Sequence, residues 1–405
     1  MATQTCDYLI IGAGVVGFAV ARALRTLDPN CSIRILEKES AAGMHASGRN
    51  SGVLHAGFYY SQDSLKARFT RDGNQRMREY CSKRKLAINA CGKLVVATRE
   101  EHLEGLEELS RRAARNGIET HLISADEARE LEPRVRTIEK ALWSPTTSSV
   151  NPKEVMKTLE SELNAAGVQI DHGVRYRSGG NAAVETSKGR FAAGHLINAA
   201  GLYADRIAHG LGFGRQYRVS PFKGLYLYAN QRIGTFKRQL YPVPNLKNPF
   251  LGVHFTITAD HHVKIGPTAI PAFWREQYSG LKGFNLLEVS ESIRNNAALF
   301  FEDPNGYSNL ATQEIRKIFK KSMVDEAALM ATDVDESMFS GWGAPGIRAQ
   351  LLNLSERKLV NDFVVEGDAN STHILNAVSP AFTCAFPFAD YVVEQIRQGW
   401  QRTAT

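Results

Sequence analysis

The N-terminal segment, residues 7–25, constrains the fold of this chain more than any other part of the sequence. It reads DYLIIGAGVVGFAVARALR. The apolar run predicts a buried strand, the glycines predict a tight turn, and the apolar spacing that follows predicts an amphipathic helix. Residues 32–38, SIRILEK, have the pattern of a second strand. The opening of the chain therefore predicts a βαβ unit.

The turn of this unit carries three glycines in the spacing GxGxxG, namely Gly12, Gly14 and Gly17. The first glycine permits the turn, the second lets the backbone approach a pyrophosphate, and the third lets helix and strand pack closely. Glu37 ends the second strand, 20 residues after Gly17, where a carboxylate accepts hydrogen bonds from an adenosine ribose. The same glycines could form a turn in an unrelated α/β fold, but this context favours a dinucleotide site for FAD or NAD.

The chain after Glu37 favours FAD. A nicotinamide enzyme would continue with regular βα units, whereas residues 47–66, SGRNSGVLHAGFYYSQDSLK, mix small residues, aromatic rings and cations. Such a loop suits a flat cofactor. A long insertion follows, and then a second strand–turn–helix at residues 195–208, HLINAAGLYADRIA. This discontinuous layout predicts one FAD. We expect it to be bound non-covalently, although His55 and Cys384 are conceivable attachment points.

Composition restricts the partners and the compartment. The 405 residues carry a formal charge of +7, which favours acidic partners such as small carboxylates, phosphates or an anionic membrane. No basic tail or RNA-binding motif supports a nucleic acid partner. The five cysteines are dispersed, as is typical of reduced thiols, and the histidines lack metal-ligand spacing. Without a signal peptide or transmembrane segment, we expect a protein that is cytoplasmic or peripheral on the inner face of a membrane.

These features predict an α/β fold in two domains. The FAD-binding domain, of the Rossmann-like glutathione-reductase type, is expected to comprise residues 1–85, 146–215 and 340–405. The substrate domain is expected to comprise residues 86–145 and 216–339 and to be built on a mixed or antiparallel sheet, because residues 217–271 are rich in strand patterns.

Nine sequence stretches resemble the L-2-hydroxyglutarate dehydrogenase/oxidase family, within the larger D-amino-acid-oxidase-like group of FAD enzymes. They read DYLIIGAGVVG, LEKE, SGRNSGVLHAGFYYSQDSLKA, CGKLVVA, NAAGLYADRI, YPVPNLKNPFLGVHFT, GPTAI, GIRAQL and AVSPAFT. The resemblance implies oxidation of L-2-hydroxyglutarate, a small dicarboxylate, to 2-oxoglutarate by hydride transfer to the flavin. Electrons would then pass to a quinone or to oxygen. The alternatives are an amine or amino-acid oxidase, and a non-catalytic FAD-binding protein that docks on membranes.

Hydride transfer from a hydroxy acid needs a base for the hydroxyl proton and cations for the carboxylates. His55 is our candidate base, since imidazole titrates near neutral pH. The alternative is that His55 only hydrogen-bonds to the flavin or packs against it. Arg348 is the candidate for the α-carboxylate, which guanidinium binds bidentately, or else it forms a structural salt bridge. Tyr59 and Tyr60 either bind a carboxylate or line the cavity.

The remaining candidates come from the blocks that resemble the family. Lys223, Tyr241 and His254 lie in blocks that match its substrate domain, whereas Lys66 is expected to be a cation on a helix surface. The candidate cofactor-binding residues are Gly12, Gly14, Gly17, Glu37, Lys38, Ser47, Arg49, Asn50, Ser51, Gly201, Asp205, Ser379 and Thr383.

A basic amphipathic helix is predicted over residues 314–324, EIRKIFKKSMV. Its cations are Arg316, Lys317, Lys320 and Lys321. Such a helix either packs its apolar side on the core or lies on an anionic bilayer. A bilayer contact would fit electron delivery to a quinone.

Overall fold

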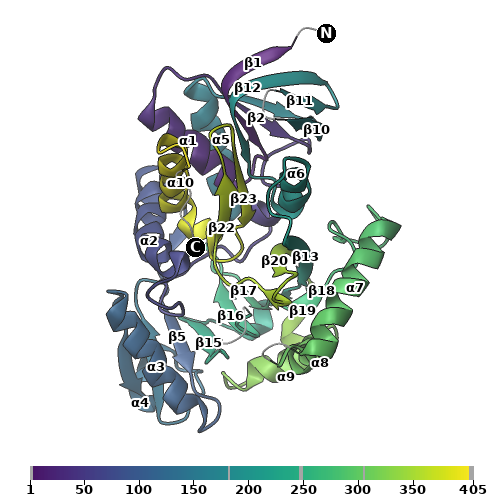
Figure 1. Ribbon diagram of the computed structural model, residues 1–405. Helices are drawn as coiled ribbons and strands as arrows, with labels where there is room; N and C mark the ends of the chain where they lie inside the picture. The colour runs from purple at the N-terminus through teal and green to yellow at the C-terminus, as the bar shows by residue number, and fades with distance from the viewer. Residues whose placement is uncertain (1–2, 181–182, 246–249, 304–305, 401–405) are drawn as a thin grey trace. The chain divides into compact units, whose positions relative to one another are not determined.

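The computed structural model describes residues 3–180, 183–245, 250–303 and 306–400. The chain forms two compact units (Figure 1). Unit 1 comprises Met1–Arg49, Pro152–Ser220 and Arg348–Thr405, and unit 2 comprises Asn50–Asn151 and Pro221–Ile347. The sequence-based division grouped segments by the ligand that each is expected to bind. The two units are grouped by contacts between residues. They therefore do not test the sequence-based division, which stays a prediction.

Unit 1 is built on a sheet with strand β1 (Gln4–Ile11) at its centre. β1 pairs in parallel with β2 (Ile33–Glu37) and with β12 (Gly189–Asn198). β9 (Gln169–His172) extends the parallel sheet beyond β2, and β23 (Ser371–Asn376) pairs in parallel with β12. The strand of the second strand–turn–helix thus lies in the same sheet as the opening βαβ unit. The antiparallel strands are β10 (Tyr176–Gly180), β11 (Ala183–Thr186) and β22 (Val364–Gly367).

Helix α1 (Val15–Leu27) follows the glycine turn and packs against α5 (Pro152–Ala165) and α10 (Ala381–Arg397). The contact between α1 and the turn is very close. A Cβ on Gly17 would lie 2.1 Å from the carbonyl oxygen of Gly12, which is far inside van der Waals contact. A residue without a side chain is therefore required where the helix crosses the turn.

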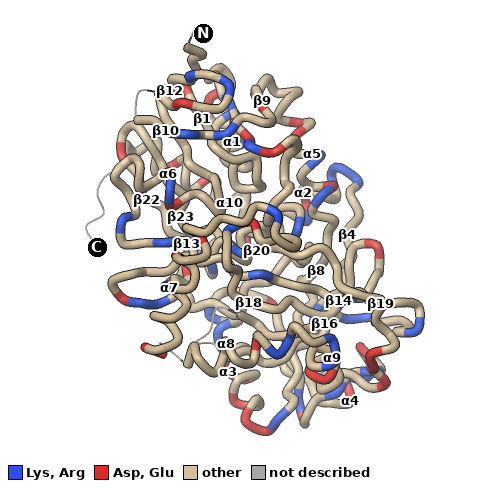
Figure 2. The backbone as a smooth tube through the Cα atoms, turned by 90° about the vertical axis from the view of Figure 1, so that its right-hand side faces the viewer, with Lys and Arg blue, Asp and Glu red and all other residues tan. Residues whose placement is uncertain are grey.

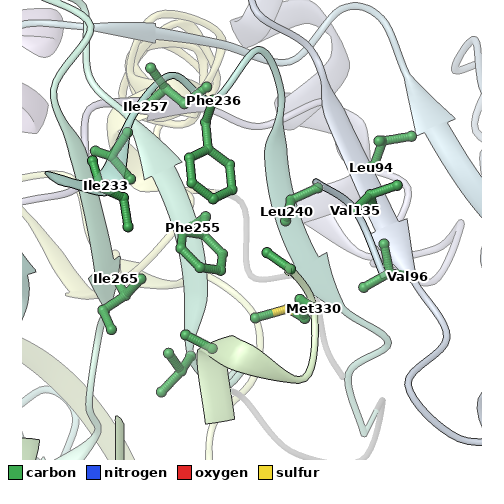
Figure 3. Packing of buried hydrophobic residues seen from close by; sticks show 14 of the residues in the cluster. Leu94, Val96, Val135, Ile233, Phe236, Leu240, Phe255, Ile257, Ile265 and Met330 are labelled. Atoms are coloured by element: carbon green, nitrogen blue, oxygen red, sulfur yellow. The ribbon is translucent and has the colours of Figure 1, made fainter. Parts of the chain in front are cut away.

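Unit 2 contains a sheet of mixed direction, as predicted. Its strands follow the order β19, β14, β17, β16, β15, β5, β7, β6, and neighbours are antiparallel except for β5 and β15. Their bounds are β5 (Lys93–Val96), β6 (His121–Ser124), β7 (Lys140–Ser144), β14 (Leu227–Ala229), β15 (Gln239–Pro242), β16 (His254–Ile257), β17 (Val263–Gly266) and β19 (Phe339–Trp342). Figure 3 shows the apolar core of this sheet, where Phe236 stacks on Phe255 with ring centroids 4.8 Å apart.

Shorter strands complete the framework. β3 (Val53–Leu54) and β4 (Ile88–Asn89) both pair with β8 (Ser148–Val150) in unit 2. β13 (Tyr217–Gly224) pairs with β18 (Ile270–Pro271), and β20 (Gly346–Asn353) pairs with β21 (Lys358–Leu359). β13 and β20 carry the chain across the boundaries between the two units.

Helix ends agree with the local sequence signals. In α4 (Ala125–Leu131), Ser124 and Glu127 form a capping box. α3 (His102–Arg115) ends before Gly117, which has a φ of +65°. That value suits the residue after a helix and favours glycine. α2 (Leu65–Lys83) begins after Ser64, whose side chain accepts a hydrogen bond from Ala67 N. α6 (Ala204–Gly210) follows the second turn.

The prediction of a single helix over residues 314–324 is wrong. α8 (Tyr307–Arg316) ends there, and α9 (Lys320–Ala328) begins after three intervening residues. Lys317 points inward, with Nζ 2.6 Å from Glu314 Oε1 and 3.2 Å from Glu326 Oε2. Burial lowers the pKa of Lys317, but the two carboxylates outweigh it and raise the pKa above its ordinary value. From the sequence pattern, Lys317 was expected on the solvent-exposed basic face of the helix, whereas it forms a buried ion pair. Among the described residues, no helix is both long and apolar enough to cross a bilayer.

The close approach of Gly17 to the glycine turn yields a first prediction. Gly17→Ala should lower the free energy of unfolding by about 1–3 kcal/mol, because the added methyl group must displace the helix from the turn. Thermal unfolding checks this. Gly210→Ala in α6 is the matched control, since a Cβ there meets nothing within 4 Å. Equal melting temperatures for the two variants would contradict the steric argument.

Candidate active site

The glycine turn of unit 1 has the geometry that a dinucleotide requires. Gly12 has a φ of +110°, and a Cβ there would lie 2.5 Å from Ala199 O. Gly14 is the N-cap of α1 and has an extended conformation. It has no side chain that could cap the helix, and the first turn of α1 carries no acidic residue. Ser47 Oγ accepts the N–H of Val15 at 2.9 Å. Such a helix start offers backbone N–H groups and a positive dipole to phosphate.

Glu37 ties this turn to the sheet. The carboxylate is 8% exposed. Its Oε2 accepts from Ala13 N at 2.9 Å, and its Oε1 accepts from Glu39 N at 2.9 Å. The carboxylate therefore holds the turn beside the end of β2, which is where a ribose is expected. These features fit FAD, with the helix start for the pyrophosphate and Glu37 for the ribose.

A small polar cluster follows Glu37. Lys38 contacts Glu39, and Lys38 Nζ lies 2.9 Å from His45 Nε2. His45 Nε2 lies 3.0 Å from Glu39 Oε1. Burial raises the pKa of Glu39, but the hydrogen bonds from Lys38 and His45 more than offset this and bring it to about 2. The cluster therefore fixes the orientation of Lys38, which remains a predicted cofactor contact.

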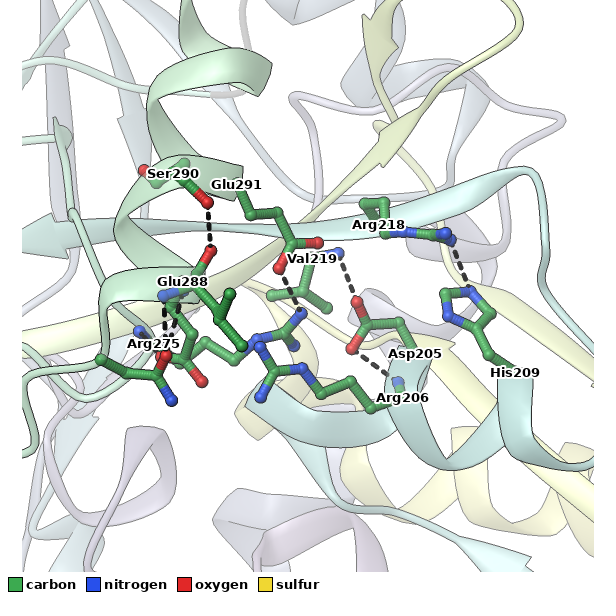
Figure 4. A network of polar contacts seen from close by, with 12 residues as sticks. Asp205, Arg206, His209, Arg218, Val219, Arg275, Glu288, Ser290 and Glu291 are labelled. Carbon is green, nitrogen blue, oxygen red and sulfur yellow. Dashed lines mark hydrogen bonds and ion pairs between the residues drawn. The ribbon is translucent and has the colours of Figure 1, made fainter.

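The other predicted cofactor residues of unit 1 have local structural roles in addition. Arg49 Nε donates to Met44 O at 2.7 Å. Asp205 is fully buried, and its two oxygens accept from Arg206 N at 2.8 Å and Val219 N at 2.9 Å (Figure 4). Gly201 has a φ of +53°. Ser379 precedes α10, and Thr383 is buried in the first turn of that helix.

Asn50 and Ser51 belong to unit 2. Asn50 Oδ1 accepts from Gly52 N at 2.8 Å, and Ser51 Oγ accepts from Val53 N at 3.2 Å. Both side chains shape the backbone that leads into β3. Their predicted contacts with the cofactor stay predictions.

His55 lies directly after β3 and is 7% exposed. The position is held by Asn74 of α2, a residue that the sequence analysis missed. Asn74 Nδ2 donates to the carbonyls of Leu54 at 3.0 Å, His55 at 3.2 Å and Thr146 at 3.3 Å. One buried amide thus links the backbone of the candidate base to the loop that precedes β8.

A cluster of aromatic rings around Lys93 lies in the same unit. Lys93 begins β5 and is fully buried, and its Nζ lies 4.7 Å from the ring centroid of Phe58, 4.6 Å from that of Tyr59 and 4.5 Å from that of Tyr241. Ring faces attract cations. Lys93 Nζ has no hydrogen-bond partner among the described residues. Burial lowers its pKa to about 7.

The rings of this cluster connect two predicted site residues. His254 stacks on Tyr241 with ring centroids 3.8 Å apart, and His254 Nδ1 lies 3.0 Å from Gly252 O. Burial raises the pKa of both Tyr59 and Tyr241 well above the ordinary value. Both phenols therefore stay protonated and can act as hydrogen-bond donors. Within unit 2 the structure brings together Tyr59, Tyr241 and His254.

Lys66 is not the surface cation that the sequence predicted. It is 6% exposed, and its ammonium lies 5.7 Å from the ring centroid of Tyr60, which is half-buried. The helix pattern of α2 did not distinguish this inward position from its charged neighbours. Lys223 is half-buried on β13, and burial lowers its pKa. Arg348 is half-buried on β20, in unit 1.

Comparison with known proteins identifies the class. The FAD dependent oxidoreductase family, DAO, matches residues 7–395. The chain belongs to this family of FAD-dependent enzymes. The predicted fold, cofactor and oxidoreductase activity are thereby confirmed.

The particular relatives share one name. The chain is 32% identical to the L-2-hydroxyglutarate dehydrogenase of Escherichia coli K12, over 96% of this chain and 93% of that one. It is 34% identical to the enzyme of that name from Indibacter alkaliphilus, over 95% and 97% of the two chains. It is 31% identical to the mitochondrial L-2-hydroxyglutarate dehydrogenase of Homo sapiens, over 98% and 90%. The family resemblance predicted from the sequence is confirmed.

Solved structures share the fold at lower identity. An FAD-bound L-α-glycerophosphate oxidase from Mycoplasma pneumoniae has a TM-score of 0.79 at 21% identity, covering 98% of this chain and 95% of that one. A glycine oxidase from Geobacillus kaustophilus has a TM-score of 0.73 at 17% identity, covering 100% and 97%. Both establish the architecture alone.

The buried ammonium of Lys93 yields a second prediction. Its folded-state pKa of about 7 lies below its ordinary value of 10.5. The unfolded chain therefore binds a proton that the folded chain releases, and stability rises with pH between these two values. Lys93→Met should raise the melting temperature most below about pH 7, where the buried charge is present, and the gain should shrink toward about pH 10.

Lys93→Arg is the matched control, because guanidinium keeps its charge at every accessible pH. It should be destabilised at both ends of the range. A gain for Lys93→Met that does not change with pH would show that packing, rather than charge, sets the stability at this position.

Proposed function

We propose that this enzyme oxidises L-2-hydroxyglutarate to 2-oxoglutarate. The observation that carries the proposal is similarity over nearly the whole chain, at 31–34% identity, to relatives named L-2-hydroxyglutarate dehydrogenase. The cations and imidazoles of the predicted site support it, because a dicarboxylate that loses a hydroxyl proton needs both. An amino-acid oxidase on the same scaffold has only fold-level similarity in its favour.

His55 acts as the base in this proposal. Its imidazole takes the hydroxyl proton of the substrate while the C–H bond at the same carbon breaks with its electron pair, so that a C=O bond forms. Bound FAD supplies the acceptor for that hydride. The amide of Asn74 holds the backbone of His55 and so fixes the point from which the imidazole would reach the substrate.

Positive and hydrogen-bonding groups hold the two carboxylates. Arg348 is proposed to bind the α-carboxylate through two parallel N–H···O bonds. Lys223 and Tyr60 are proposed to contact the second carboxylate, at the other end of the five-carbon substrate. The stacked pair of His254 and Tyr241 is proposed to form an apolar wall with a polar edge that excludes water from the reacting carbon.

Electrons are proposed to leave the reduced enzyme for a quinone or for oxygen. We also propose a peripheral contact of residues 314–324 with the inner face of an anionic membrane. Lys317 is buried and takes no part. Ile318 and Phe319, in the turn between α8 and α9, are 47% and 70% exposed, and Arg316 and Lys321 are exposed beside them.

An anaerobic absorbance titration tests the reaction. L-2-hydroxyglutarate should bleach the oxidised flavin band, whereas D-2-hydroxyglutarate and L-glutamate should leave it unchanged. Bleaching by amino acids alone would instead identify an amino-acid oxidase. A flavin that responds to none of these acids would reject the proposed substrate.

The role of His55 is tested by rapid mixing. His55→Ala should slow flavin reduction by about 100-fold or more, because the hydroxyl proton then has no acceptor. Flavin content and melting temperature serve as the folding control. Asn74→Ala leaves the imidazole in place but frees its backbone, so its effect should be smaller. A near-normal reduction rate in His55→Ala would remove the proposed base.

A further inference from the structure

One buried lysine of unit 2 has no polar partner. Lysines and arginines are spread over the whole chain (Figure 2), and the buried ones among the described residues are Lys66, Lys93, Lys264, Arg275 and Lys317. Lys93 is 0% exposed, and its Nζ has no hydrogen-bond partner in the described part of the chain. Burying a charge without a partner costs stability. Such a cost is typical of residues that serve a functional site.

Lys93 lies on the face of the unit 2 sheet that is opposite the apolar core. That core (Figure 3) includes one residue from each of three neighbouring strands: Leu94, Leu240 and Phe255. Successive residues of a strand point to opposite faces, so the residues next to these, Lys93, Tyr241 and His254, share the other face. Strand β15, which carries Tyr241, pairs with β5 on one side and with β16 on the other. Tyr241 therefore comes from the strand between the lysine and the histidine.

The ring of Tyr241 connects Lys93 to His254. Lys93 Nζ lies 4.5 Å from the ring centroid of Tyr241. The imidazole of His254 stacks on the same ring, with centroids 3.8 Å apart and planes inclined by 17°. An ammonium is attracted to the face of a phenol ring, and a closely packed interior transmits the displacement of one side chain to the next. The position of the His254 imidazole therefore depends on the group that holds Tyr241.

The same ammonium contacts the loop that carries His55. Lys93 Nζ lies 4.7 Å from the ring centroid of Phe58 and 4.6 Å from that of Tyr59. These two rings lie 4.4 Å apart and follow His55 by three and four residues. All of these residues belong to unit 2. One buried cation thus joins the loop of the candidate base to the strands that carry Tyr241 and His254.

We propose that Lys93 is a positioning residue of the oxidation, and that its ammonium holds the His55 loop and the Tyr241–His254 pair in their places beside the substrate. This role rests on the functions proposed above for His55 and His254. Lys93 itself touches neither the substrate nor the flavin and acts only through the rings around it. A neutral amine lacks the charge that a ring face attracts, so both contacts should loosen when Lys93 loses its proton.

The surroundings of Lys93 make this effect depend on pH. Burial alone lowers the pKa of Lys93 to about 7, and no charged side chain contributes. The titratable groups around it are the phenols of Tyr59 and Tyr241 and, close to Tyr241, the thiol of Cys91. Burial raises the pKa of all three, so they stay neutral near pH 7. Lys93 is therefore charged below about pH 7 and neutral above it, whereas His55 must be neutral to act as a base.

Stopped-flow reduction of the full-length holoenzyme by L-2-hydroxyglutarate tests this role, with kred/Kd measured between about pH 5.5 and about pH 9. In the wild-type enzyme kred/Kd should rise as His55 loses its proton and fall as Lys93 loses its own. Lys93→Met should keep the rise and lack the fall. At about pH 6 its kred/Kd should be about tenfold to 100-fold below wild type, because the reacting groups are misplaced, and the two enzymes should converge above about pH 8.

Lys264→Met is the matched control. Lys264 is also a buried lysine of unit 2, and its Nζ lies near the rings of Tyr226 and Tyr228, which do not connect it to the His55 loop. This variant should keep the wild-type pH profile. Since Lys93→Met is expected to melt at a higher temperature than wild type, a loss of activity in that variant is not a loss of folding. An unchanged kred/Kd in Lys93→Met, or the same pH profile as wild type, would overturn the proposed role.

A measurement without substrate separates this role from the choice of substrate. If L-2-hydroxyglutarate does not bleach the wild-type flavin, the proposed substrate is wrong, and the kinetic comparison uses the acid that does bleach it. Imidazole NMR requires no acid at all. The His254 signal, assigned by its loss in His254→Gln, should shift in wild type as Lys93 titrates near pH 7, and this step should be absent in Lys93→Met. A step that persists in Lys93→Met, or that wild type lacks, would show that Lys93 does not act on His254.

Discussion

The contact between Gly17 and the carbonyl of Gly12 is the constraint on which unit 1 depends. A Cβ at Gly17 would lie 2.1 Å from that oxygen, so α1 can cross the turn only because no side chain is there. This crossing places the N-terminus of α1 at the end of β1, where Glu37 holds Ala13 from the neighbouring strand. The phosphate site is predicted at this crossing, because the N-terminus of α1 offers backbone N–H donors there.

Unit 2 buries several cations. Three buried lysines there have different neighbours and respond differently. Lys317 lies between two carboxylates, and its pKa is raised. Burial lowers the pKa of Lys93, whose Nζ lies near the rings of Phe58, Tyr59 and Tyr241, to about 7. Burial likewise lowers the pKa of Lys264, which lies near the rings of Tyr226 and Tyr228, to about 8. The carboxylates beside Lys317 therefore outweigh the cost of burying its charge, whereas burial dominates at Lys93 and Lys264. The protonation state of Lys93 consequently changes near neutral pH.

The sequence predicts those parts of the structure that short-range chemistry decides. The capping box at Ser124, the helix start at Pro152 and the helix end at Gly117 depend on neighbours within a few residues, and all three are present. The parallel placement of β12 beside β1 was predictable because it repeats the pattern of the opening strand. Burial of Lys66 or Lys317 was not predictable, since each sits in a charged helix pattern that does not show which of its cations faces inward.

The candidate site shows the same limit, and helix α7 (Leu286–Glu302) shows it most clearly. His55 and the glycines were identifiable from their own segments, whereas Asn74 was not, because its three carbonyl partners come from two distant loops. The spacing of apolar and polar residues along a helix likewise shows that it has two different faces, but not which face is buried. In α7 the fixed acceptors and donors around Ala272 and Arg275 select the polar face, and the apolar side chains are left exposed. The orientation of an amphipathic helix is thus decided by the surface that receives it.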